Sequence, residues 1–149
     1  MNKYFIDYEG KNNKEISSIQ KAGGITGGIE NVIETGFISK NYLDKSPISG
    51  GGYGLFTSVD YKKGDIVEVN PFREYTENYS GLERYRHGSH LTDGKYLLVL
   101  GNGSMLNHNK DENLCHYYMK DKQFYVYFAK RDIKKGEELF INYGDDVKF

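Results

Sequence analysis

The sequence contains a single cysteine, two prolines and no tryptophan. With only Cys115, a disulfide within the chain and a cysteine-rich zinc cluster are both excluded, so reducing surroundings are expected. Charges are nearly balanced, with 20 basic and 21 acidic residues, which gives no overall attraction to nucleic acid or to an anionic membrane. No apolar run approaches membrane-spanning length, and the first residues lack the apolar centre of a secretion signal. These absences predict an intracellular protein with no direct nucleic-acid or membrane partner.

Large apolar groups and glycines, in contrast, are abundant. The chain has 149 residues, of which 14 are tyrosine, 8 are phenylalanine and 18 are glycine. This apolar content predicts a folded core rather than a disordered chain. Residues 1–36 have few large apolar groups around a glycine-rich centre, and we interpret them as an extension. Residues 37–149 are expected to form the one main domain.

Short strand patterns separated by glycine turns dominate that domain. Strands are predicted at 37–43, from Tyr53 onward, and at 65–70, 96–100, 124–128 and 139–142. Residues 65–70 alternate as a half-buried strand does, whereas 96–100 is apolar throughout, as in a fully buried strand. Residues 74–95 are polar and are predicted to be an insert with short helical turns. Because no long amphipathic helix is present, the fold class is mostly β.

Two turns share one sequence pattern. Asp60–Asp65 and Arg131–Glu137 each place two lysines before a glycine, and an acidic residue follows and leads into a strand. Each glycine can take the positive φ that a tight turn needs. We interpret Glu137 and Glu138, which follow the second lysine pair, as solvated turn residues.

Three distant segments carry residues that could form a site. Gly50–Gly54 leaves the backbone bare for close approach of a ligand, although a hairpin turn alone explains the pattern. Asn107 and His108 follow a predicted buried strand and need polar partners or solvent. Tyr143 ends the last strand, where its hydroxyl could emerge at the rim of the core, although core packing is the ordinary role of a tyrosine. Together they predict a pocket built from three pieces of chain.

The histidines raise the alternative of a metal site. His87 and His90 have a chelating spacing, and with His108 they would suit a small β-barrel oxygenase that binds iron tightly. However, the segment is rich in glycine and offers no helix that would present both rings on one face. The sequence therefore favours a surface or pocket role for these histidines, and no metal ligand is predicted.

Taken in order, these segments resemble the SET domain, the fold of many protein-lysine methyltransferases. Gly52–Phe56 and Lys62–Val67 are similar to the opening Gly-x-Gly strand of the family and the turn after it. Leu100–His108 is similar to the family's Asn-His motif, and Gly136–Tyr143 is similar to its closing Glu-Leu-x-x-x-Tyr motif. The resemblance covers about residues 37–149 and implies several small curved sheets, short helical turns and a C-terminal pseudoknot.

The resemblance also implies a reaction and its residues. A methyl group would pass from S-adenosylmethionine to the side-chain amine of a lysine in a protein, whose basic segment could be a histone tail. Tyr143 is expected to be catalytic, where the cofactor and substrate channels meet. The expected cofactor-binding residues are Gly52, Tyr53, Gly54, Asn107, His108 and Tyr143. The expected residues of the substrate channel are Tyr85, Tyr96 and His116.

The chain also departs from the family pattern. Asn109 and Lys110 replace the serine and cysteine that usually follow the Asn-His pair, which leaves open a degenerate SET fold that binds peptides or partner proteins without catalysis. Retention of Asn107, His108 and Tyr143 favours the enzyme. Without cysteine-rich flanking modules, the chain resembles compact SET proteins of large DNA viruses and bacteria. A viral protein would act in the host nucleus or cytoplasm, and a homodimer is one way to complete the channel.

Overall fold

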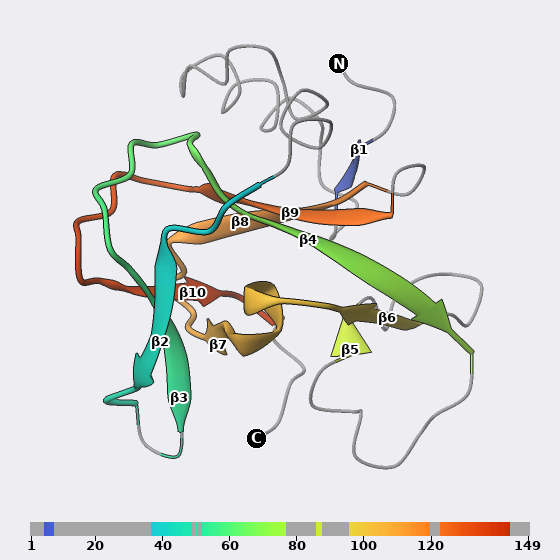
Figure 1. Ribbon diagram of the computed structural model, residues 1–149, viewed down its shortest axis with the longest axis horizontal. Coiled ribbons are helices and arrows are strands. Elements are labelled where there is room, and N and C mark those ends of the chain that lie inside the picture. The colour runs from blue at the N-terminus through green and yellow to red at the C-terminus, as the bar shows by residue number, and fades with distance from the viewer. Residues whose placement is uncertain are drawn as a thin grey trace.

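The computed structural model describes residues 5–7, 37–48, 50, 52–76, 86–87, 96–119 and 123–143. These residues form short strands and one 3-10 helix (Figure 1). In chain order the elements are β1 (Phe5–Asp7), β2 (Asn41–Lys45), β3 (Tyr53–Thr57), β4 (Ile66–Tyr75), β5 (Arg86–His87), β6 (Tyr96–Val99), η1 (Asn102–Met105), β7 (Asn107–His108), β8 (Leu114–Met119), β9 (Phe124–Ala129) and β10 (Glu138–Ile141). In this part of the chain, no helix has the length and apolar character needed to cross a membrane.

The larger sheet is antiparallel and has the order β1-β8-β9-β4-β6-β5. Its central strand β9 is buried from Tyr125 to Ala129, so both of its faces are covered. Tyr125, Tyr127 and Phe128 from this strand, with Phe72 from β4, are the largest fully buried side chains. The predicted mostly β class is confirmed, and tyrosine supplies two of the largest side chains in the core.

Two of the predicted strands differ from the structure in burial. Glu68 and Asn70 of β4 are both buried, so the half-buried prediction for residues 65–70 is wrong. The register with β9 shifts between Ile66 and Glu68, and this bulge breaks the simple alternation of faces. In β6 the prediction of full burial fails at the end of the apolar run, where Leu100 is exposed beyond the strand.

The limits of several elements also differ from prediction. The first strand of the domain begins at Asn41 rather than at residue 37. β4 continues to Tyr75, into the predicted insert, and β5 is a strand within that insert rather than a helical turn. β1, in the predicted extension, pairs with β8. The domain boundary at residue 36 stays a prediction.

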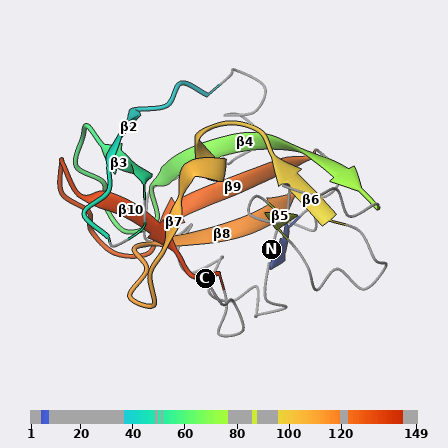
Figure 2. The ribbon, with the colours of Figure 1, turned by 90° about the horizontal axis from the view of Figure 1, so that it is seen from below.

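The smaller sheet positions the candidate site. Its strand order is β2-β3-β10-β7, with β10 antiparallel to β3 and parallel to β7. Leu139 of β10 lies opposite Leu55 of β3, and Phe140 lies opposite Asn107 of β7. Figure 2 shows β7 beside β10 at the junction of the two sheets. The closing strand therefore lies between the glycine-rich strand and the Asn-His pair, although these segments are far apart in the sequence.

The two turns of shared sequence pack against each other, and we call them the twin turns. Gly64 and Gly136 have φ of 91° and 88°, the positive values that glycine permits in such turns. Tyr61 donates its backbone N–H to the carbonyl of Ile133 (2.8 Å), and the Ile133 N–H donates to the Tyr61 carbonyl (2.9 Å). The Asp60 carboxylate accepts from the backbone N–H of Lys135 (2.8 Å). This reciprocal bonding fixes the start of β4 against the start of β10.

The twin turns predict a loss of stability in acid. The backbone N–H of Lys63 holds the pKa of Asp132 below its usual value. For Glu137, partial burial acts to raise the pKa, but hydrogen bonds from the Lys134 N–H and from Arg131 outweigh it, and the pKa is lowered. Carboxyl groups with lowered folded pKa values stabilise the fold above their ordinary values of 3.8 and 4.5, and this stabilisation is lost as the pH falls through the lower folded values.

We therefore expect the urea concentration at the midpoint of unfolding to decrease as the pH is lowered from about 6 to about 3. The decrease should be smaller in Glu137→Gln. Glutamine retains an acceptor for the Lys134 N–H but does not titrate. Urea titrations at each pH measure the difference. Equal pH dependence in the two proteins would show that Glu137 does not contribute.

Candidate active site

Gly54 lies where the smaller sheet has no room for a side chain. A Cβ added there would lie 2.1 Å from Oε1 of Glu138 and 3.0 Å from Nδ2 of Asn107. Because Gly54 is not among the positive-φ glycines, the requirement is steric rather than conformational. The glycine therefore permits a carboxylate from β10 and an amide from β7 to meet against β3.

Glu138 is a residue of the site that the sequence analysis did not assign to it. Its side chain is 8% exposed, so the interpretation of Glu138 as a solvated turn residue is wrong. One carboxylate oxygen accepts from Asn107 Nδ2 (2.9 Å) and the other from the Ser46 hydroxyl (2.9 Å). Its backbone carbonyl accepts from Asn113 Nδ2 (2.8 Å). Strand pairing turns the side chain toward the space left by Gly54. The position of Glu138 as the glutamate of the closing motif was the sequence feature that could have identified it.

His108 and Tyr143 form the second contact of the site. The backbone N–H of Tyr143 donates to Nδ1 of His108 (2.9 Å), and the two ring centroids are 5.4 Å apart. An amide N–H can only donate, so Nδ1 accepts, and the neutral imidazole carries its proton on Nε2. This bond places a ring N–H at Nε2 and ties the end of β10 to β7.

The hydroxyl of Tyr143 donates to the carbonyl of Leu106, the residue immediately before β7. The Tyr143 ring is partly buried and packs against the main core cluster. The tyrosine is thus held at its backbone by His108 and at its hydroxyl by Leu106. As its position at the end of a strand predicted, the side chain lies at the rim of the core.

The backbone before Gly54 is open. Gly52 has a φ of 60°, and a Cβ added there would meet nothing within 4 Å. Tyr53 is 56% exposed, and its carbonyl accepts from Asn107 Nδ2 (3.3 Å). Five of the residues predicted to bind the cofactor therefore lie around one junction, with open space beside the sixth, Gly52.

The predicted substrate channel is described only in part. His116 on β8 is 8% exposed, its Nδ1 lies 2.9 Å from the Tyr125 hydroxyl, and its ring is stacked on Tyr127 with centroids 6.1 Å apart. Tyr85 lies outside the described residues, as does the side chain of Tyr96, whose backbone belongs to β6. A channel role for these three residues stays a prediction.

The alternative of a metal-dependent oxygenase receives no support from the described residues. Within them, no group of three His, Cys, Asp or Glu side chains could hold a metal ion. The side chains of His87 and His90 lie outside the described part of the chain. His108, the third predicted ligand, uses Nδ1 to accept from Tyr143.

Comparison with known proteins places this geometry in a family. The model of the SET domain matches residues 52–144. The histone-lysine N-methyltransferase specific for H3 lysine-37 of Schizosaccharomyces pombe is 34% identical over 107 residues, which are 66% of this chain and 70% of that protein. The histone-lysine N-methyltransferase EZH2 of Chaetomium thermophilum is 31% identical over 140 residues, 80% of this chain but 9% of that protein.

Solved structures agree with the sequence comparison. A Plasmodium falciparum protein provisionally named a histone methyltransferase superimposes with a TM-score of 0.61 at 27% identity, covering 74% of this chain and 97% of that one. An active polycomb repressive complex 2 in the basal state gives a TM-score of 0.66 at 27% identity, over 82% of this chain and 17% of that one. The expected SET fold is confirmed. This chain belongs to the SET-domain family, and it is a protein-lysine methyltransferase.

Proposed function

We propose that this protein methylates a lysine in a basic segment such as a histone tail, with S-adenosylmethionine as the methyl donor and Tyr143 as the catalytic residue. One observation carries the proposal: the Tyr143 hydroxyl is held by the Leu106 carbonyl where β10 meets β7. Relatives whose names describe histone-lysine methyltransferases support the substrate class.

The residues at the junction fit the proposed cofactor. S-adenosylmethionine supplies an electrophilic methyl group on a sulfonium, and SET-domain methyltransferases use it. The chain at Gly52 and Tyr53 borders open space in which a ligand could lie against the backbone. Asn107 Nδ2 already donates to Glu138 and to the Tyr53 carbonyl, so Asn107 would contact the cofactor through Oδ1 or through its main chain. His108 would contribute Nε2–H, since its Nδ1 is used.

Tyr143 can orient the side-chain amine of the substrate lysine. A lysine amine with its usual pKa of about 10.4 is an ammonium at pH 7, and its deprotonation costs about 4–5 kcal/mol. A nearby positive charge and exclusion of water both favour the neutral amine, which alone has a lone pair for attack. The Tyr143 hydroxyl donates a hydrogen bond to the Leu106 carbonyl, so its oxygen can accept from the amine N–H. The amine would thereby be oriented for methyl transfer, in which the N–C bond forms as the S–C bond of the sulfonium breaks and the neutral thioether leaves. The proton that the lysine ammonium must lose beforehand goes to solvent.

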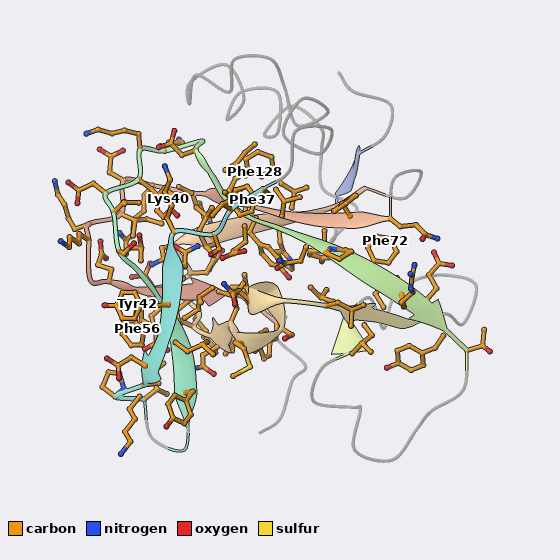
Figure 3. All side chains as sticks on the ribbon, in the orientation of Figure 1. Phe37, Lys40, Tyr42, Phe56, Phe72 and Phe128 are labelled. Atoms are coloured by element: carbon orange, nitrogen blue, oxygen red, sulfur yellow. The ribbon has the colours of Figure 1, made fainter. Side chains whose placement is uncertain are left out.

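Isotope-labelled S-adenosylmethionine mixed with core histones tests the proposal. We expect label on histone lysine with the wild-type protein and far less label with Tyr143→Phe. The control variant Tyr42→Phe removes a hydroxyl from a tyrosine that is 42% exposed and stacked on Phe56 (Figure 3), and it should label histone as the wild type does. Cofactor binding without histone label would refute the histone substrate. If the protein neither binds the cofactor nor labels histone, the degenerate, partner-binding alternative is favoured.

A nuclear or other intracellular location follows from this proposal, because histones and their modifying enzymes occupy those compartments. The named relatives come from eukaryotes, and a viral or bacterial origin stays a prediction. Homodimerisation also stays a prediction.

A further inference from the structure

Glu68 on β4 is a buried carboxylate outside the site described above. Its side chain is 1% exposed. Oε1 accepts from Asn41 Nδ2 (2.8 Å), from Asn102 Nδ2 (3.2 Å) and from the Ser39 hydroxyl. None of the ion pairs formed within the described residues includes Glu68. A buried carboxylate surrounded by neutral donors is tolerated only while those donors stay in place, so this cluster strongly restrains its members.

Asn41 is itself held in the orientation that serves Glu68. The Tyr61 hydroxyl donates to Asn41 Oδ1 (2.9 Å), which turns Nδ2 of Asn41 toward the carboxylate. Burial raises the pKa of the Tyr61 hydroxyl, and the negative charge of Glu68 adds to the effect. Tyr61 therefore remains a protonated donor at neutral pH. Through Asn41, its first residue, β2 is bonded to Glu68 of β4.

The same cluster fixes η1 on β4. Asn102, the first residue of η1, donates to Glu68, and the Gly103 N–H donates to Asn70 Oδ1 (2.7 Å). A Cβ added at Gly101 would lie 2.7 Å from Asn70 Nδ2, so η1 lies directly against this side chain. Figure 1 shows the short coil of η1 immediately before β7. The position of η1 thus depends on polar groups of β4.

Two independent supports then hold the two halves of the active site. Leu106 follows η1, and its carbonyl accepts from the Tyr143 hydroxyl. Asn107 and His108 are instead paired with β10, and Asn107 is also bound to Glu138. A displacement of η1 should move the Leu106 carbonyl more than it moves the Asn-His pair.

We propose that Glu68 is a positioning residue for methyl transfer: by holding η1, it places the Leu106 carbonyl that orients the hydroxyl of Tyr143. This inference rests on the proposed role of Tyr143. It predicts that damage to the cluster slows the reaction while cofactor binding persists, because the cofactor-binding half is held by β10.

The direct test is Asn102→Asp, alone and combined with Glu68→Gln. The single variant places a second carboxylate against Glu68, where Asn102 Nδ2 now lies 3.2 Å from Oε1, and repulsion should displace η1. We expect kcat to fall about 10-fold or more, with the Kd for S-adenosylmethionine changed less than about 3-fold. Glu68→Gln removes one of the two charges and should restore most of kcat. Gln123→Glu, the same kind of change at an exposed turn residue, is the matched control.

A second readout does not require activity. In protein with 13C-labelled tyrosine, the Tyr143 ring signal, assigned by its loss in Tyr143→Phe, should shift in Asn102→Asp and return in the double variant. A fixed Tyr143 signal, or a parallel fall of kcat, cofactor affinity and Tm without rescue, would overturn the positioning role. If the wild-type protein methylates nothing, the proposed function fails, and the Tyr143 signal still decides whether Glu68 positions the tyrosine.

Discussion

Replacing Tyr143 with phenylalanine is expected to lower kcat for lysine methylation by about 100- to 1000-fold, the usual cost of removing one positioned polar group from a reacting centre. The variant keeps the ring against the core and keeps the backbone N–H that donates to His108. It loses only the hydroxyl that donates to the Leu106 carbonyl and that we propose accepts from the substrate amine. Initial rates of methyl transfer at saturating cofactor and substrate measure the effect.

The same variant should bind S-adenosylmethionine with nearly unchanged affinity, because Asn107 and His108 keep their pairing with β10. Calorimetric titration of the two proteins checks this expectation. Tyr42→Phe should retain full activity and full affinity. Wild-type turnover by Tyr143→Phe would show that the hydroxyl has no part in the reaction, whatever the fold of the site.

Gly54→Ala is expected to weaken S-adenosylmethionine binding by about 30- to 100-fold, which corresponds to an overpacking cost of about 2–3 kcal/mol. The new methyl group would occupy the position of a Glu138 carboxylate oxygen and press on the Asn107 amide. Both groups are hydrogen-bonded to each other, so neither can move without loss. Calorimetry measures the affinity, and thermal unfolding measures the accompanying loss of stability.

A compensating variant separates steric overlap from other effects of Gly54→Ala. Glu138→Asp shortens the opposing side chain by one methylene, so the double variant should bind the cofactor more tightly than Gly54→Ala alone. Wild-type affinity in Gly54→Ala, or no recovery in the double variant, would contradict the packing described for this junction.

Local sequence chemistry predicted the parts of the structure that depend on neighbouring residues. The positive φ of Gly64 and Gly136 follows from the turn pattern that each shares, and the structure has both. The position of Tyr143 at the rim of the core follows from the apolar strand before it. The order of the motifs was sufficient to indicate the family, because the motifs of the SET domain can be read along the sequence without knowing which residues are in contact.

Burial of the acidic residues could not be predicted locally. Glu138 follows a lysine-rich turn, and only its pairing beside the distant Gly54 shows why it is buried. Glu68 alternates with apolar neighbours as a solvent-facing residue would, yet a bulge and three polar partners from other segments place it inside. Both carboxylates need hydrogen-bond donors, and these come from residues far away in sequence. Their role is therefore visible only in the assembled sheets.

The most direct test of the proposed active site is titration of S-adenosylmethionine into 15N-labelled protein, followed through the backbone amide signals. The site predicts the largest shifts at Gly52, Tyr53, Gly54, Asn107, His108 and Tyr143. Signals of Lys63 and Lys134 in the twin turns should change little. Saturable shifts confined to the junction of β3, β10 and β7 would support the assignment. Shifts centred elsewhere, or none at saturating cofactor, would contradict it.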